Sequence, residues 1–353
     1  MKKRWMIYGA YGYTGKLITR EAINQGVVPV LAGRSADKLT PLAKRLNLDY
    51  LVFDLKNENT ILKNFKDFDL IFNAAGPFKY TSAPIIKACL KTGTNYVDIT
   101  GEVSIFEQNF KFDQKAKDKE IVIISGVGFD VVPSDCMAKH VSEKIPNPMH
   151  LELGISGLGG FSPGTLKTMV EYMHIGPLIR RDDLLIKNPQ GNGARKIRFL
   201  DKERKVYTIT WGDLSTAYRT TGIPNITIYM PLPKQSRSLM QSLGTLKKST
   251  SEENTFKELA QKWIEKNIEG PDEQIRQNAR SYIWARVANN KGEEAQAWLE
   301  TMEAYRFTAI AGVRCVEKLF NLNLKGVLTP ALAFGKDFIL ELPETNRYDF
   351  IYE

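Results

Sequence analysis

Up to about residue 145, the chain alternates between short apolar runs and longer amphipathic stretches. The runs have the length of buried strands, and the stretches between them repeat apolar residues at helical spacing. Leu70–Phe72 and Ile121–Ile124 are apolar on both faces, which is typical of a parallel sheet covered by helices on both sides. Repeated strand–helix units therefore predict an α/β domain with a doubly wound parallel sheet of the Rossmann type. The strands are expected at Trp5–Tyr8, Val27–Leu31, Tyr50–Phe53, Leu70–Asn73, Tyr96–Ile99 and Ile121–Ile124. The helices between them are expected at Thr14–Asn24, Ala36–Leu46, Thr60–Phe65, Ser82–Lys91 and Phe106–Lys117.

The pattern changes after Pro133. Ser134 is a good N-cap for a helix reaching about Lys144, and two prolines then stop that helix. Longer, more alternating runs follow, and together with three helical stretches they predict an α+β domain with a mixed or antiparallel sheet. Its strands are expected at Leu151–Ser156, Lys205–Thr210, Ile226–Met230, Ser281–Ala288 and Gln296–Thr301. Its helical stretches are expected at Leu166–Met173, Phe256–Asn267 and Ala304–Phe320. Asn188–Arg198 and Ser236–Asn254 are predicted to be loops.

A chain of 353 residues is comfortable for two domains. We expect a Rossmann domain over residues 1–147, a second domain over 148–302 and a C-terminal segment of helices and tail over 303–353. The run Trp5–Tyr8 is too short for a signal peptide or a membrane span, so a cytoplasmic protein is expected. Leu239, Leu243 and Leu246 recur beside basic residues, and this stretch is either a helix on a membrane surface or, as we favour, a solvated helix.

The net charge of +9 favours anionic ligands, but no basic stripe interleaved with aromatic residues indicates a nucleic-acid surface. Cys89, Cys136 and Cys315 have no CxxC spacing, and the chain has only three histidines. A disulfide framework and a metal site are therefore not expected. A small molecule carrying phosphates is a sufficient anionic partner, and a homodimer is expected on base rates alone.

The segment between the first strand and the first helix carries the strongest chemical signal. It reads Gly9-Ala10-Tyr11-Gly12-Tyr13-Thr14-Gly15. The first glycine permits a sharp turn, the second lets the backbone approach a pyrophosphate, and the third lets the helix pack closely on the sheet. Because strand, glycines and helix occur in this order within a series of strand–helix units, the segment predicts a dinucleotide site rather than a structural turn.

The end of the second strand indicates which dinucleotide is bound. Where an NAD-binding domain usually has a carboxylate, this chain has Gly33-Arg34-Ser35, with Lys38 one turn later. Arg34 can bind a 2′-phosphate through two hydrogen bonds, and Ser35 and Lys38 can add a donor and a charge. The alternative is a helix N-cap beside a solvated arginine. We favour NADP(H) as the cofactor.

Three more strand ends face the same crevice. After the fourth strand, Asn73-Ala74-Ala75-Gly76-Pro77 leaves room for the cofactor beside the backbone. Asp98 follows the fifth strand, and Gly128, Phe129 and Asp130 follow the sixth. A carboxylate at these ends either binds substrate and moves protons or satisfies loop amides, and the sequence leaves both alternatives open.

These residues resemble the saccharopine dehydrogenase-like NADP-binding oxidoreductases, in particular the bacterial branch grouped with trans-acting enoyl reductases. The matching segments are Gly9–Gly15, Ala32–Ser35, Asn73–Phe78, Tyr96–Glu102, Gly126–Asp135, Gly159–Glu171, Trp211–Tyr229, Glu269–Arg276 and Gly326–Gly335. The resemblance implies NADP(H), a second domain that supplies the substrate wall, and a C-terminal segment that packs back on the first domain. True saccharopine dehydrogenation requires arginines for several carboxylates. Arg180, Arg181 and Arg219 are candidates, but Arg180 and Arg181 lie in a polar stretch expected at the surface.

The richest group in the second domain is Trp211-Gly212-Asp213-Leu214-Ser215-Thr216-Ala217-Tyr218-Arg219. Tyr218 is the first candidate proton donor, followed by Asp213 and Asp130, and Trp211, Tyr218 and Arg219 are candidate substrate contacts. Core packing explains Trp211 and Tyr218 equally well. A Tyr-x-x-x-Lys pair of the short-chain dehydrogenase type is absent from the sequence.

The sequence therefore predicts an NADP(H)-dependent oxidoreductase. We expect a reductase that transfers hydride to a C=C, C=O or C=N bond of a small or lipid-like substrate. Phe161, Met169 and Met173 could supply an apolar wall, although core packing accounts for the methionines as well. The alternative is a non-catalytic NADP(H)-binding protein, acting as a redox sensor or membrane-associated scaffold.

Overall fold

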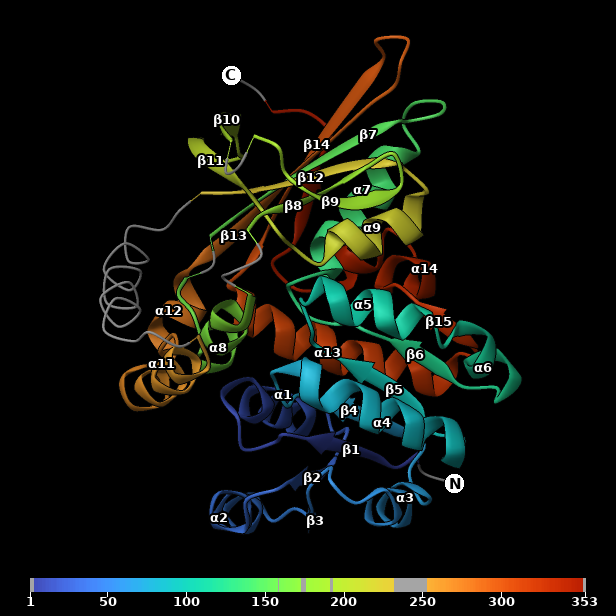
Figure 1. The fold of residues 1–353 in the computed structure, drawn as a ribbon, viewed down its shortest axis with the longest axis vertical. Helices are drawn as coiled ribbons and strands as arrows, with labels where there is room; N and C mark the ends of the chain where they lie inside the picture. The colour runs from blue at the N-terminus through green and yellow to red at the C-terminus, as the bar shows by residue number, and fades with distance from the viewer. Residues whose placement is uncertain (1–2, 158, 173–175, 191–192, 232–252, 352–353) are drawn as a thin grey trace.

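The computed structural model describes residues 3–157, 159–172, 176–190, 193–231 and 253–351. Two sheets organise these residues, one in the lower and one in the upper half of the molecule (Figure 1). The lower sheet is parallel, with the strand order β15-β6-β5-β4-β1-β2-β3. Its strands are β1 (Trp5–Tyr8), β2 (Val30–Gly33), β3 (Tyr50–Val52), β4 (Leu70–Asn73), β5 (Asn95–Asp98), β6 (Val122–Ile124) and β15 (Gly326–Leu328).

Helices cover both faces of the parallel sheet because successive strand residues point to opposite sides. Trp5 and Ile7 of β1 join one hydrophobic cluster, and Met6 and Tyr8 join another. The helices around the sheet are α1 (Tyr13–Asn24), α2 (Ala36–Leu46), α3 (Glu58–Phe65), α4 (Phe78–Thr92), α5 (Val103–Phe110), α6 (Asp113–Asp118) and α13 (Ala304–Asn321). This arrangement confirms the Rossmann-type domain predicted from the sequence.

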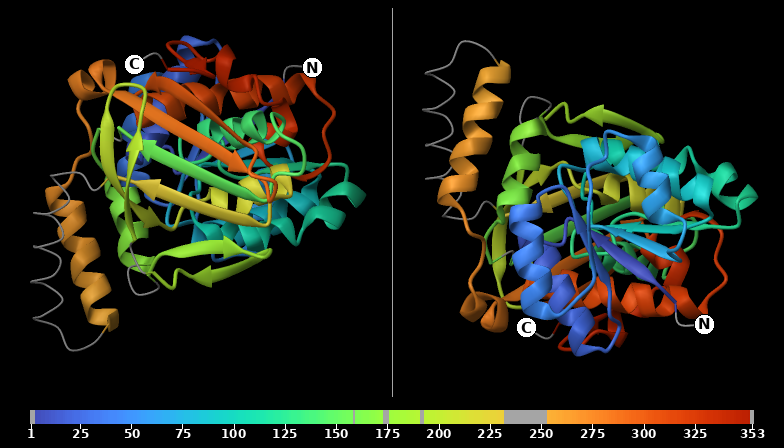
Figure 2. Two further views of the ribbon diagram at one scale, coloured as in Figure 1. Left: turned by 90° about the horizontal axis from the view of Figure 1, so that it is seen from above. Right: turned by 90° about the horizontal axis from the view of Figure 1, so that it is seen from below.

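The upper sheet is mixed, as predicted. Its main path runs β10-β11-β12-β7-β13-β14-β16, and β8 and β9 form a hairpin beside β12. The pair β12–β7 is parallel, and the other neighbours are antiparallel. Figure 2 shows this sheet from above and the parallel sheet from below. The strands are β7 (His150–Ser156), β8 (Leu178–Arg181), β9 (Leu184–Lys187), β10 (Ala194–Arg198), β11 (Glu203–Ile209), β12 (Asn225–Met230), β13 (Arg280–Ala288), β14 (Glu294–Met302) and β16 (Asn346–Tyr348).

The remaining helices belong to the second half of the chain. They are α7 (Val132–Ser142), α8 (Pro163–Tyr172), α9 (Asp213–Thr221), α11 (Glu253–Asn267), α12 (Glu273–Asn278), α14 (Pro330–Phe334) and a 3-10 turn at Phe338–Glu341. Leu166 and Val170 of α8 pack with Ala260 and Ile264 of α11 in a small hydrophobic cluster of their own. These two helices stand at one side of the molecule, beside α12 (Figure 1).

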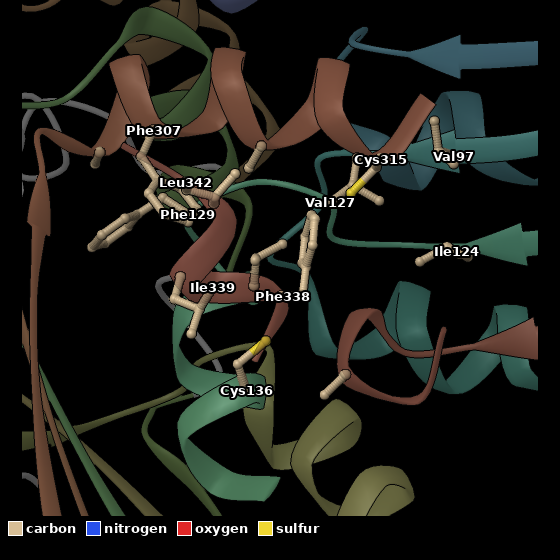
Figure 3. Close-up of a cluster of buried hydrophobic side chains, with 14 of the residues drawn as sticks. Val97, Ile124, Val127, Phe129, Cys136, Phe307, Cys315, Phe338, Ile339 and Leu342 are labelled. Atoms are coloured by element: carbon tan, nitrogen blue, oxygen red, sulfur yellow. The ribbon is translucent and has the colours of Figure 1, made fainter. Parts of the chain in front are cut away.

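The C-terminal segment connects the two sheets. α13 packs against α1, and β15 completes the parallel sheet, whereas β16 pairs with β14 of the mixed sheet. Figure 3 shows the core below α13, where Phe307 meets Phe129 with ring centroids 5.7 Å apart and Phe338 lies nearby. Residues 303–353 therefore pack on the first domain and also extend the second sheet.

The structure corrects several expected boundaries. α7 lies against β13, β14 and β7, so it packs on the mixed sheet although the domain boundary was expected at residue 147. Ser134 lies inside α7, and its hydroxyl approaches the Val131 carbonyl instead of capping the helix. The helix expected at Phe106–Lys117 is two helices, and the loop expected at Asn188–Arg198 contains β10. Most of Ser236–Asn254 lies outside the described residues.

Candidate functional site

The loop between β1 and α1 has the backbone geometry of a pyrophosphate cradle. Gly9 has a φ of +89°, and a Cβ there would lie 2.8 Å from the backbone nitrogen of Ala75. A Cβ on Gly15 would lie 2.3 Å from the Gly9 carbonyl oxygen, so a glycine is needed for α1 to pack this close to the strand. Gly12 is the N-cap of α1, whose first turn has no acidic residue and no side-chain cap in the described contacts. Its open amides fit the phosphates of a dinucleotide.

The carboxyl end of β2 presents two cations and a hydroxyl beside that loop. A Cβ on Gly33 would lie 2.5 Å from Cε1 of Tyr11, so the tyrosine ring lies directly over this glycine. Arg34 and Lys38 are exposed, and Ser35 is the N-cap of α2 without a side-chain capping hydrogen bond in the described contacts. This donor set is complementary to a 2′-phosphate.

The loop after β4 contains residues that line a cavity and residues that hold the loop in place. Ala74 and Gly76 line the cavity described below. Asn73 is fully buried and holds the loop in place, because its side chain donates to Thr81 and Tyr96 and accepts from the Ala75 amide. Pro77 is the N-cap of α4. The expected direct contact of Asn73 with the cofactor is therefore corrected to a supporting role.

A cavity of about 610 Å³ opens at the carboxyl ends of β1, β4, β5 and β6, where a parallel sheet places its ligands. Its opposite wall comes from the second half of the chain, through α8, the β8–β9 hairpin, Trp211 and the start of α13. The apolar lining side chains are Ala74, Phe78, Ile99, Val103, Phe129, Phe161, Met169, Leu178, Leu185, Trp211 and Ala304. The ionisable lining side chains are Glu102, Glu107, Lys111, Asp130 and Tyr305. The cavity lining includes four of the residues expected near the substrate, namely Gly128, Phe129, Asp130 and Trp211.

Asp130 is the carboxyl group best placed for proton transfer. Burial raises the pKa of Asp130 to about 7, the only cause of the shift. Its Oδ2 would lie 2.8 Å from a Cβ on Gly101, which also lines the cavity. A carboxyl group with this pKa is present in both protonation states at neutral pH, as an acid–base catalyst requires.

Two further cavity groups are not among the site residues predicted from the sequence. The buried carboxylate of Glu102 accepts from the Phe78 and Lys79 amides at 2.8 and 3.2 Å, so it caps the N-terminus of α4. Its place beyond β5 was a usable signal. The Tyr305 hydroxyl accepts from the Ser162 amide at 2.6 Å and lies 2.9 Å from Thr165 Oγ1. Tyr305 begins α13, far along the chain from any predicted motif, so no sequence signal identified it.

Tyr218 and Arg219 are not part of the described cavity wall, contrary to expectation. The Tyr218 ring lies under the Arg180 guanidinium, 4.1 Å from ring centroid to Cζ. Arg180 is buried rather than at the surface, and it pairs with Glu107 at 2.8 Å. Arg219 also reaches Glu107, at 3.2 Å. Arg180 and Arg219 therefore stabilise the cavity wall indirectly, because both bind the carboxylate of Glu107, which lines the cavity.

Asp98 and Asp213 are likewise buried beneath the site rather than on its described wall. Asp98 accepts from the Thr100 and Gly126 amides and from the Tyr96 and Ser125 hydroxyls, so it ties together the loops after β5 and β6. Asp213 lies 2.8 Å from the Ser134 hydroxyl, and burial raises its pKa well above the usual range. Neither is positioned to contact substrate.

The Tyr13 side chain was expected to contact the cofactor, but it contacts the second half of the chain. Its hydroxyl donates to the Pro271 carbonyl at 2.5 Å and accepts from Arg276 at 3.1 Å. The side chain thereby fastens the glycine-rich loop to the segment before α12. Thr14, from the same loop, does line the cavity. Met173 lies outside the described residues.

Comparison with known proteins identifies the first domain. Residues 5–124 match the family model described as the saccharopine dehydrogenase NADP binding domain. Over this segment the chain is therefore similar to the NADP-binding domain of saccharopine dehydrogenases. The match confirms the resemblance and the NADP-type cofactor expected from the glycine-rich loop.

Curated relatives agree over the same region. A saccharopine dehydrogenase-like oxidoreductase of Bos taurus is 30% identical over 150 residues, covering 37% of this chain and 35% of that protein. A trans-acting enoyl reductase of Mycobacterium ulcerans is 31% identical over 146 residues, covering 38% of this chain and 34% of that protein. A lipid droplet localized protein of Caenorhabditis elegans is 25% identical over 185 residues, covering 47% and 43%. The matches thus span about a third to two fifths of these relatives' length.

Two solved structures share the fold of the whole chain. Saccharopine dehydrogenase (L-Glu forming) of Saccharomyces cerevisiae aligns with a TM-score of 0.65 at 11% identity, covering 98% of this chain and 99% of that one. Homospermidine synthase of Legionella pneumophila, in complex with NAD, aligns with a TM-score of 0.68 at 9% identity, covering 100% and 92%. Identities this low show the fold alone.

The described part of the chain contains no helix long and apolar enough to cross a membrane. The relatives include proteins named for lipid droplets and for mitochondria, so the cytoplasmic location stays a prediction.

Proposed function

We propose that this protein is an NADP(H)-dependent reductase that transfers hydride to a C=C, C=O or C=N bond of a small or lipid-like substrate. The observation that carries the proposal is the cavity at the carboxyl end of the NADP-binding sheet, which places the half-buried Asp130 among apolar side chains. When bound, the nicotinamide cofactor supplies the hydride. The chain's own residues hold the substrate and supply the proton.

The proton step follows from the chemistry of Asp130. Hydride adds to one carbon of the double bond, and the electron pair of that bond moves to the partner atom, which then needs a proton. Asp130 supplies this proton from its protonated form and becomes a carboxylate, which is reprotonated from solvent. Its pKa of about 7 suits this role at neutral pH.

The charge of the cavity argues against a substrate with several carboxylates. Among the described lining residues, Lys111 is the one cation, against the carboxyl groups of Glu102, Glu107 and Asp130. The nearby Arg180 and Arg219 are engaged by Glu107. A saccharopine-like substrate would find no arginine on this described wall, so we favour neutral acceptors.

The apolar wall favours acceptors with a hydrocarbon chain. Phe161 and Met169 come from the α8 side, and Leu178 and Leu185 come from the β8–β9 hairpin. Burying one methylene contributes about 0.8 kcal/mol. We therefore expect KM to fall up to about tenfold for every two methylenes added, until the cavity is filled.

NADPH oxidation, followed at 340 nm, tests the proposal. The acceptors are 2-enoyl thioesters of N-acetylcysteamine with increasing chain length, aliphatic ketones and cyclic imines. Saccharopine with NADP⁺ tests the reverse reaction. We expect turnover of a neutral acceptor class with KM falling along the chain-length series, and a kcat at least ~100-fold lower in Asp130→Asn.

The matched control is Asp67→Asn, which removes an exposed carboxylate outside the cavity. It should retain wild-type kcat. NADPH binding without turnover of any acceptor class would contradict the reductase proposal and favour the non-catalytic alternative. Turnover of saccharopine alone would contradict the substrate class.

A further inference from the structure

We propose that Tyr13 and Tyr305 couple the glycine-rich loop, where NADP(H) would bind, to the α8 wall, which is the part of the cavity lining that comes from residues 161–171. Cofactor binding then orders this wall before substrate enters. Tyr13 is then a positioning residue acting through Tyr305. The inference rests on the proposed cofactor site. It concerns the contact between Tyr13 and Tyr305 and the contact between Tyr305 and the start of α8, neither of which is needed to bind the cofactor.

The first link joins the glycine-rich loop to the second half of the chain. Tyr13 lies between Gly12 and Thr14, so its backbone belongs to the loop whose amides fit the pyrophosphate. Its ring packs directly on Gly270, where a Cβ would lie 2.7 Å from Tyr13 Cε2. Its hydroxyl is fixed to the Pro271 carbonyl. A shift of the loop therefore moves the ring, and anchoring the loop holds the ring in place.

The second link joins that ring to the cavity wall. The rings of Tyr13 and Tyr305 meet edge to face, with centroids 5.1 Å apart and an interplanar angle of 86°. Tyr305 lines the cavity, and its hydroxyl contacts the Ser162 amide and Thr165 Oγ1 at the start of α8. Burial raises the pKa of Tyr305 to about 12, so the hydroxyl stays protonated at neutral pH.

The α8 wall is suited to respond because its own hydrophobic core is small. Leu166 and Val170 pack on α11 rather than on either sheet. Across the cavity α8 has polar contacts with the first domain, including Thr168 with Glu102 at 3.4 Å and Glu171 with Lys79 at 4.0 Å. Segments with few buried apolar contacts open at low free-energy cost, and a ligand that fixes one linked contact protects them.

Hydrogen exchange measured by mass spectrometry tests the coupling. Amide exchange in residues 161–171 is compared without NADPH and at a concentration that saturates each variant, as shown by its own fluorescence titration. In the wild type we expect NADPH to slow exchange by about fivefold or more. In Tyr305→Phe and Tyr13→Leu the slowing should fall below about twofold at full occupancy.

Two further variants separate coupling from structural damage. Tyr13→Phe keeps the ring contact with Tyr305, so it should restore most of the slowing that Tyr13→Leu loses. Tyr80→Phe changes an exposed tyrosine of α4 and should behave as wild type. Wild-type protein that binds NADPH without slowing exchange in 161–171 would overturn the coupling alone. Equal slowing in Tyr305→Phe and wild type would also overturn it. Wild-type protein that binds no NADPH would overturn the cofactor site and the coupling with it.

Discussion

At the scale of single residues, the polar side chains near the site fall into those that line the cavity and those that stabilise the structure around it. Asp130 and Tyr305 line the cavity, whereas Asp98, Asp213 and Tyr218 stabilise the loops and helix behind it. All of these side chains are polar and lie near strand or helix ends, so residue type alone does not distinguish the two groups.

The environment of Asp130 has a consequence for stability. Its folded pKa of about 7 lies above the value of about 3.9 for an unfolded aspartate, so the folded chain binds this proton more tightly. The cost of ionising Asp130 is therefore absent below about pH 4, grows between about pH 4 and 7, and is complete above that window. Asp130→Asn removes the cost, and we expect it to stabilise the protein by on the order of 4 kcal/mol more at pH 8 than at pH 4.

Urea unfolding of wild type, Asp130→Asn and the control Asp67→Asn at both pH values measures this difference. If Asp130→Asn changed the free energy of unfolding equally at both pH values, this would contradict the claim that burial raises the pKa of Asp130.

The sequence points to one continuous set of candidate cofactor residues but leaves several candidate proton donors, for a physical reason. The glycine-rich loop and Arg34 lie in one continuous strand–turn–helix unit, so local spacing carries the information. The proton donor depends on which side chain reaches the cavity, and that is set by packing between distant segments. Asp130 was one of three candidates, and Tyr305 was not a candidate because it reaches the site through α13.

At the scale of elements, local patterns predicted regular strands and helices but not the β8–β9 hairpin. β4 and α2 have the expected bounds, because their apolar periodicity is regular. The β8–β9 hairpin was missed because its turn residues, Asp182 and Asp183, adopt positive φ without the usual glycine. This hairpin matters because Leu178 and Leu185 line the cavity.

The packing of α1 on β1 gives an element-scale prediction. Gly15→Ala would place a Cβ 2.3 Å from the Gly9 carbonyl oxygen and force the helix away from the strand. We expect a loss of about 3 kcal/mol in the free energy of unfolding and at least ~10-fold weaker NADPH binding, measured by urea unfolding and fluorescence titration.

Gly26→Ala is the matched control at the other end of α1. A Cβ there meets nothing within 4 Å, so only its left-handed backbone opposes the change, at about 1 kcal/mol. Equal effects of the two substitutions would show that close helix–strand packing is not what Gly15 provides.

At the scale of the whole molecule, the C-terminal segment makes the two sheets interdependent. β15 adds a strand to the parallel sheet and β16 adds one to the mixed sheet, and α13 contacts both α1 and β14. The resemblance implied only that this segment packs back on the first domain. The pairing of β16 with β14 is a long-range contact that no local pattern specifies.

Removing residues 323–353 deletes one strand from each sheet together with Phe338 of the shared core. We expect the shortened chain to lose its cooperative thermal transition and to bind 8-anilinonaphthalene-1-sulfonate, because both sheets lose apolar cover. Calorimetry and dye fluorescence measure these effects. A single sharp transition at the full-length temperature would contradict the interdependence of the two halves.

The central claim is that the first domain binds NADP(H) and selects it through Arg34. The most direct test is a fluorescence titration with NADPH and with NADH on the wild type, Arg34→Ala and Arg45→Ala, the last being an exposed arginine at the far end of α2. We predict that the wild type and Arg45→Ala prefer NADPH by about tenfold or more, roughly 1.4 kcal/mol, and that Arg34→Ala loses this preference. A preference that survives in Arg34→Ala, or binding of neither nucleotide to the wild type, would contradict the account.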